Sequence, residues 1–240
     1  MFNHSMKLAE VIQINFNTLS VISRFGIELG FGDKSVQQVS IEKGINPDFF
    51  LDILNTFHDS HYFPQRHLQS FKVTEIVDYL RKTHAHYIYE VIPYIESLMN
   101  QLAEGCRNPD EIMLVRNFFN DYKDELFKHL TWEDKDIFPY ALEVEESYNT
   151  KENASNIQSR MKQYSMSNFL DDHDDIEEKL NDIKTLFIKY IPPVRNQQLC
   201  VRILREFNLL EKDINDHARI EEKVLGPKVV EMEKAITKLA

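Results

Sequence analysis

The stretch HLTWEDKDIFP, residues 129–139, returns 88 residues later as HARIEEKVLGP, residues 217–227. In both copies a Glu follows the His by four positions, and a Pro follows the Glu by six. Residues four apart lie on one face of an α-helix, on adjacent turns. Each copy therefore predicts a helix that presents an imidazole and a carboxylate together, and the Pro is expected to kink or end that helix.

Four long helical segments contain or flank these copies, at about 72–104, 110–147, 155–190 and 196–237. Each has apolar residues at three- and four-residue spacing, which is typical of an amphipathic helix. The segments are separated by EGCRNPD, SYNTKENAS and IPPVRN, which are rich in turn-forming residues. Short connections between long helices make neighbours antiparallel, so we predict an all-α protein with an up-down-up-down four-helix bundle.

Each predicted helix carries one His in its apolar seam: His84, His129, His173 and His217. The successive spacings are 45, 44 and 44 residues, and the connecting segments lie near the middle of each interval. A chain that runs up and down by equal amounts, at a rise of 1.5 Å per residue, returns to the same level each time. The four imidazoles are therefore expected to form one cluster in the core.

Three carboxylates, each four positions after one of these His, enter the same predicted core: Glu133, Glu177 and Glu221. Burying an ionised carboxylate costs several kcal/mol unless a positive charge compensates it. No Lys or Arg lies in the same seams near this level, and a metal ion would supply the missing charge. Imidazole and carboxylate together suit iron, manganese or zinc. Four His and two Glu exceed the ligands of one ordinary zinc and suit two metals bridged by carboxylates.

Two positions leave alternatives open. His86 competes with His84, because Glu90 follows it by four, but the two side chains point about 200° apart on a helix and only one can face inward. His84 follows Leu80 by four in the apolar seam and is the predicted ligand, whereas His86 lies on a mostly polar face. Glu177 could be a ligand, a hydrogen-bond partner of a His ring, or a residue that turns outward.

The segment before the bundle has a different pattern. Residues 6–57 predict short helices that end at GFGDKS and KGINPD, whose Gly, Pro, Asn and Asp stop helices. The polar, His-rich stretch HDSHYFPQRHLQS then predicts a linker. We therefore divide the chain into a small helical N-terminal domain at 1–60, a linker at 61–71 and the bundle at 72–240.

The overall composition excludes several classes of function. Of 240 residues, 42% are hydrophobic and 28% charged, and the net charge is −11. This charge argues against a nucleic-acid partner, because phosphate recognition needs a basic surface. The N-terminus lacks the apolar core of a secretory signal, and no run approaches the roughly 20 apolar residues that span a bilayer. Two Cys without a CxxC motif fit a reducing compartment, so we expect a cytoplasmic protein without a membrane partner.

The four helix patterns together resemble a known family. THAHYIYEVIP, HLTWEDKDIFP, DDHDDIEEKL and HARIEEKVLGP are similar to the four ligand helices of hemerythrin-like, or HHE cation-binding, domains, over about residues 70–235. The resemblance implies a non-haem centre of two iron ions, with zinc or manganese as substitutes. The terminal ligands that the resemblance implies are His84, His129, His173 and His217. The bridging carboxylates that it implies are Glu133 and Glu221.

The N-terminal segment resembles a second family. SRFGIELGFGDKSVQQV is similar to the small N-terminal domain of iron–sulfur cluster repair proteins, which answer nitric oxide and oxidative stress. The resemblance implies a small diatomic ligand, nitric oxide or dioxygen, and an iron–sulfur protein or a second copy of the chain as partner. That family carries a Cys-Cys pair where this chain has Gly30 and Phe31, so we expect chemistry in the bundle alone. An oxygen, redox or iron sensor without turnover is the alternative.

Overall fold

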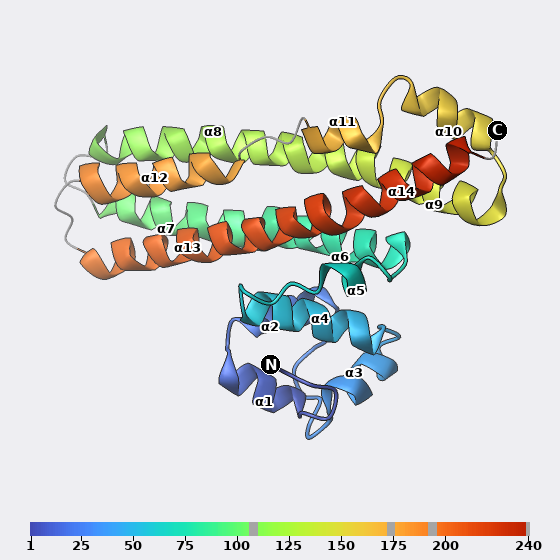
Figure 1. Ribbon diagram of the computed structural model, residues 1–240. Coiled ribbons are helices and arrows are strands. Elements are labelled where there is room, and N and C mark those ends of the chain that lie inside the picture. The colour runs from blue at the N-terminus through green and yellow to red at the C-terminus, as the bar shows by residue number, and fades with distance from the viewer. Residues whose placement is uncertain (106–109, 172–175, 192–195, 239–240) are drawn as a thin grey trace.

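The computed structural model describes residues 1–105, 110–171, 176–191 and 196–238, with residues 110–111 and 176–178 described by their backbone only. Its regular elements are all helical in these ranges, and the one β-bridge found there is the isolated pair Lys7 and Ser35. Figure 1 shows a long helical bundle with a small helical domain packed against one side. The predicted all-α fold with a helical bundle is therefore confirmed.

The bundle is built from four long helical arms, and consecutive arms run in opposite directions (Figure 1). Three of them contain a five-residue π-helical turn, labelled η, within the described part of the chain. The arms are, in order, α6 (Val73–His86), η1 (Tyr87–Val91) and α7 (Ile92–Glu104); α8 (Asp110–Trp132), η2 (Glu133–Ile137) and α9 (Phe138–Thr150); α10 (Ala154–Met161), α11 (Met166–Asp171) and α12 (Ile176–Tyr190); and α13 (Gln197–Ile220), η3 (Glu221–Leu225) and α14 (Gly226–Thr237).

A Pro follows each π-helical turn as the second residue of the next helix: Pro93, Pro139 and Pro227. Proline has no backbone N–H and cannot donate the hydrogen bond that continues an α-helix. A π-helical turn widens the backbone locally and is often found at functional sites. Of the two outcomes expected for Pro139 and Pro227, a kink or an end of the helix, an end is not seen, because α9 and α14 continue beyond them; a regular α-helix is instead interrupted by the π-helical turn just before each Pro.

The third arm differs from the single helix predicted over 155–190. Helix α10 ends at Met161 and α11 begins only at Met166. A new helix start explains the break: Asn168 accepts a hydrogen bond from the backbone N–H of Ser165 at 2.9 Å, and its own N–H lies 3.4 Å from the Ser165 hydroxyl. Such reciprocal bonds are typical of helix N-termini. Helix α10 consequently packs on α9 and α14 at one end of the bundle (Figure 1).

The N-terminal domain consists of short helices whose starts follow ordinary capping rules. Ser35 caps the third with a reciprocal bond to Gln38, and Asn46 caps the fourth, which has Pro at its first position. The helices are α1 (Leu8–Ile14), α2 (Thr18–Arg24), α3 (Val36–Glu42) and α4 (Pro47–His58), and α5 (Gln65–Leu68) follows within the predicted linker.

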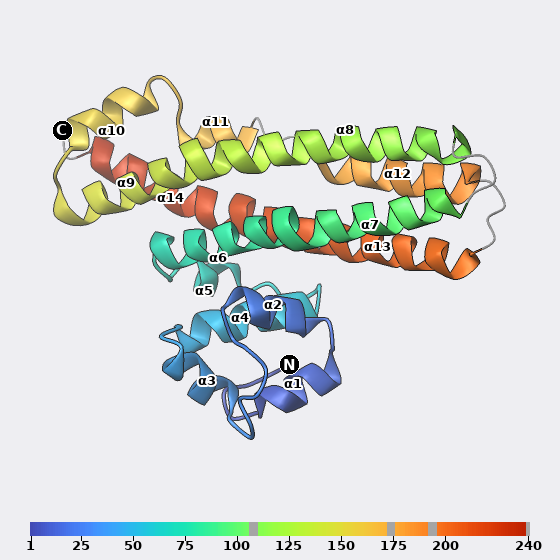
Figure 2. The same cartoon turned by 180° about the vertical axis from the view of Figure 1, so that it is seen from behind.

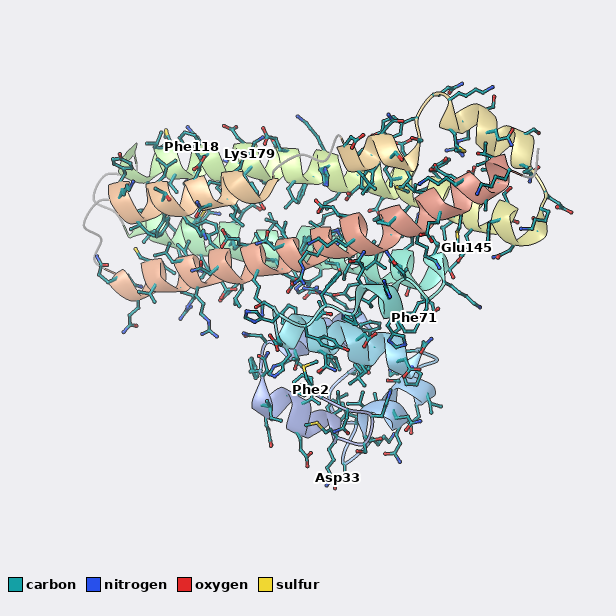
Figure 3. All side chains as sticks on the ribbon, viewed as in Figure 1. Phe2, Asp33, Phe71, Phe118, Glu145 and Lys179 are labelled. Atoms are coloured by element: carbon teal, nitrogen blue, oxygen red, sulfur yellow. The ribbon has the colours of Figure 1, made fainter. Side chains whose placement is uncertain are left out.

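The N-terminal domain docks on the bundle through aromatic rings. Phe25 stacks on Tyr79 of α6 with ring centroids 5.3 Å apart, and Phe49 lies 5.2 Å from Phe71. Phe71, labelled in Figure 3, and Leu68 are both buried, so the connecting segment is packed rather than loose. Seen from behind in Figure 2, α2 and α4 lie along the side of the bundle that carries α6 and α13. One continuous hydrophobic core joins the small domain to α6 and to the end of the bundle that carries α9 and α14.

Candidate metal centre

Four side chains from three helical arms converge in the bundle core: His84, Glu133, His217 and Glu221. One ligand atom from each lies within 4.8 Å of the others, and all four side chains are buried. The Nε2 atoms of His84 and His217 are 3.0 Å apart. Glu133 and Glu221 are the first residues of η2 and η3. His84 and His217 are 133 positions apart in the sequence, and yet their donor atoms border one small space.

His129 lies beside the same cluster. Its Nε2 atom is 3.1 Å from Oε1 of Glu133, whose Oε2 lies 3.4 Å from Nε2 of His84. In the other copy of the repeated pattern, Nε2 of His217 lies 3.0 Å from Oε1 of Glu221. Each copy therefore holds its imidazole against its own carboxylate, and Glu133 also links two arms.

Two residues of the third arm that the sequence singles out lie wholly or partly outside the described part of the chain. The predicted ligand His173 lies outside the described residues. Glu177 is in the first turn of α12, but its side chain is likewise outside the described part of the chain. The choice among ligand, hydrogen-bond partner and outward residue therefore stays open for Glu177, and the role of His173 stays a prediction.

The carboxylate of Glu133 lacks the partners that a buried anion needs. Its side chain is 0% exposed, its ion pairs within the described residues are with His84 and His129 only, and neither oxygen accepts a hydrogen bond there. Burial lowers the pKa of His217 to about 4, against the opposing effect of the Glu133 carboxylate. His217 is therefore neutral near pH 7 and offers a lone pair rather than a positive charge. A cation is the partner that both kinds of group require.

Two other buried glutamates show how this protein satisfies a carboxylate without a metal. Glu145 accepts the backbone N–H of Val73 at 2.7 Å and caps the start of α6. Glu233 accepts the Tyr140 hydroxyl at 2.5 Å and the backbone N–H of Met166 at 3.0 Å. All three glutamates are buried, but only Glu145 and Glu233 accept hydrogen bonds from groups of the described residues. This difference indicates that the residues in the centre fit a bound metal ion.

Sequence reasoning missed one carboxylate next to the centre. Oδ1 of Asp134 lies 3.2 Å from Nδ1 of His84, the ring nitrogen that faces away from the cluster. Neither atom has a hydrogen-bond partner within the described residues, but a carboxylate beside the outer ring nitrogen is the arrangement that commonly orients a metal-binding imidazole. The sequence signal for Asp134 was that an acidic residue directly follows the Glu in both copies of the repeated pattern.

His84 and His86 occupy different environments. His84 is 1% exposed and belongs to the cluster, whereas Nδ1 of His86 lies 3.1 Å from Glu90 on the side of the bundle that faces α2. We expect His84→Ala to lower the metal content or change the metal spectrum, because it removes a donor atom from the centre. His86→Ala is expected to change neither, as metal analysis and absorption spectra of both variants would show. The reverse result would mean that the first arm is rotated relative to the centre.

A buried ion pair brings the N-terminal domain close to this centre. Both terminal nitrogens of Arg24, at the end of α2, donate to the carboxylate of Asp213, with Nη1 to Oδ1 at 2.9 Å. Asp213 precedes His217 by one helical turn on α13. The Cζ atom of Arg24 also lies 5.8 Å from the ring centroid of Tyr87. No local sequence signal could have found a pair that joins positions 189 apart.

These contacts define a helical bundle with a buried histidine–carboxylate cluster that could hold a metal ion. Residues 75–229 match the family described as "Hemerythrin HHE cation binding domain", and the chain belongs to this family. It is also similar to the iron-sulfur cluster repair protein ScdA of Staphylococcus haemolyticus (strain JCSC1435), at 20% identity over 230 residues. That similarity covers 94% of this chain and 98% of the relative. Within the described residues, none of the helices has the length and apolar character needed to cross a membrane.

Proposed function

We propose that this chain holds two iron ions in its bundle core and binds or reduces nitric oxide or dioxygen in the cytoplasm, in iron-centre repair or stress defence. The convergence of two His and two Glu from three arms within 4.8 Å is the observation that carries the proposal. The name of the ScdA relative supports iron–sulfur cluster repair as the setting, with an iron–sulfur protein as the macromolecular partner.

In this proposal the ligands divide into two classes. The carboxylates of Glu133 and Glu221 would be the ligands shared by the two ions, since each lies against an imidazole and has a second oxygen to offer. Bound iron would supply the change between ferrous and ferric states and open positions for a diatomic ligand. Zinc or manganese would occupy the same donors. The terminal ligands are His84, His129, His173 and His217.

A sensor or binding module without turnover is the second candidate function, and the N-terminal loop favours it. The family that this loop resembles carries two cysteines where this chain has Gly30 and Phe31. Gly30 has a φ of +101°, which L side chains rarely adopt. The ring of Phe31 packs on the core of the N-terminal domain. This loop is therefore adapted to a glycine and an apolar side chain rather than to a thiol pair.

Metal analysis of protein purified without oxygen tests the proposal. We expect about two irons per chain, an absorption spectrum that changes on exposure to air, and binding of nitric oxide. Consumption of nitric oxide over many turnovers, with a reductant present, would support a reducing enzyme, whereas binding that stops at saturation would support the sensor. A single tightly bound zinc, with no spectral response to air or nitric oxide, would overturn the proposal.

A further inference from the structure

The first arm contains a variant of the repeated pattern with a tyrosine in it. Glu133 and Glu221 each begin a π-helical turn and precede a Pro by six residues. Tyr87 does both on the first arm, where η1 begins at Tyr87 and Pro93 follows. The phenol thus stands at the position on its arm that the two carboxylates occupy on theirs.

The surroundings of Tyr87 place it next to the metal centre. The side chain is 1% exposed, and its ring lies 5.9 Å from the ring of His217 in an edge-on arrangement of 72°. The Arg24 guanidinium lies over the ring at 5.8 Å and is itself held by Asp213. The ring is therefore fixed between a predicted metal ligand and the buried ion pair.

The hydroxyl of Tyr87 has no hydrogen-bond partner among the residues that the structure describes, although it is fully buried. A buried, unpaired hydroxyl is unfavourable, and its presence in a protein core needs a reason such as a bound ligand. A neutral phenol is a hydrogen-bond donor. In contrast to the carboxylates at the equivalent positions, it can approach a metal-bound anion without charge repulsion.

We propose that the hydroxyl of Tyr87 donates a hydrogen bond to the small polar or anionic ligand that occupies the open position of the metal centre. This inference rests on the proposed function, because it requires a metal that accepts an exogenous ligand. Tyr87 then selects ligands that accept a hydrogen bond and holds a proton close to the bound ligand. Apolar packing alone would not require the oxygen.

Azide is a suitable probe, because it is a small anion whose binding to ferric iron is followed by absorption. The variants are Tyr87→Phe, which removes one oxygen and keeps the ring, and Tyr140→Phe as control. Tyr140 is also buried, but its hydroxyl donates to Glu233 away from the centre. Full-length iron-loaded proteins are titrated with azide, and iron content and melting temperature are measured in parallel. Because the azide band arises from loaded molecules alone, partial loss of iron does not obscure the Kd.

We expect Tyr87→Phe to raise the azide Kd about tenfold, as the loss of a hydrogen bond to a charged acceptor predicts. Tyr140→Phe should leave the Kd unchanged even if it lowers the melting temperature. An unchanged Kd in Tyr87→Phe, in protein that holds iron and binds azide, would overturn this inference and leave the proposed function intact. Wild-type protein that holds no iron would overturn both, whereas wild-type protein that holds iron without binding azide would overturn this inference alone.

Discussion

The double substitution Glu133→Gln with Glu221→Gln is expected to leave the chain with almost none of its bound iron when it is purified without oxygen. Glutamine keeps the shape of the side chain but removes the negative charge that a metal ion compensates. Both positions are essentially unexposed, at 0% and 1%, so solvent cannot replace the lost ligand. Iron per chain is the measurement, with the spectrum of a coupled pair of irons as a second readout.

The double substitution should affect the melting temperature differently in metal-free protein and in protein with ferrous iron. The metal-free double variant is expected to unfold at a temperature equal to or higher than metal-free wild type, because two buried charges have been removed. Ferrous iron should raise the melting temperature of wild type, since a ligand at 100 times its Kd contributes about 2.7 kcal/mol. It should have little effect on the double variant.

Glu145→Gln is the matched control for this experiment. Glu145 is also a buried glutamate, but it caps α6 and lies apart from the metal centre, toward the end of the bundle that carries α9 and α14 (Figure 3). The control should lose about 1 to 3 kcal/mol of stability and keep its iron, because a helix cap is weakened and no metal donor is removed. Unaltered iron content in the double variant would show that the carboxylates are not ligands.

Much of the centre's geometry follows from spacing that is visible in the sequence. Equal hairpin lengths return the chain to one level, and the i and i+4 rule puts His129 with Glu133 and His217 with Glu221. The choice of His84 over His86 as the inward residue rests on helical periodicity alone, and the structure places His84 in the cluster. Local periodicity is thus enough to align donors on regular helices, even across large separations in sequence.

Other features depend on contacts that periodicity does not encode. The break before α11 comes from the exchange of hydrogen bonds between Ser165 and Asn168, which a seam pattern does not register. The π-helical turns shift the register after Tyr87, Glu133 and Glu221, whereas apolar residues at three- and four-residue spacing predict only a regular α-helix. Docking of one domain on another is decided by surfaces that meet only after both have folded.

The ion pair between Arg24 and Asp213 is the strongest consequence of that docking. The side chain of Arg24 is 1% exposed and that of Asp213 is 11% exposed, so water screens the pair weakly. Removal of one partner leaves the other charge buried and uncompensated, which typically costs about 3 to 5 kcal/mol. We therefore expect Arg24→Leu to lower the free energy of unfolding by an amount in this range, as urea denaturation would measure.

Two further variants separate the buried pair from general effects of mutation. Arg24→Leu combined with Asp213→Leu should recover much of the lost stability, because neither charge is then left alone. Lys82→Leu breaks an exposed pair with Asp78 on α6 and should change stability by less than about 0.5 kcal/mol. Equal losses in Arg24→Leu and in the paired variant would show that packing, rather than charge, makes Arg24 important.

The single variant Arg24→Leu also tests whether the N-terminal domain influences the metal centre. From the missing cysteines we expect the chemistry to lie in the bundle, so a chain that begins near His67 would keep its metal and its reaction. The structure qualifies that expectation, because such a chain also loses the partner of Asp213, one turn from His217, and exposes the face of Tyr79 that Phe25 covers.

Full-length Arg24→Leu is the cleaner test. We expect it to hold iron at the wild-type ratio and to bind azide with an altered Kd, since the guanidinium no longer fixes the ring of Tyr87. Unchanged azide binding in a destabilised but iron-loaded Arg24→Leu protein would limit the N-terminal domain to a structural role.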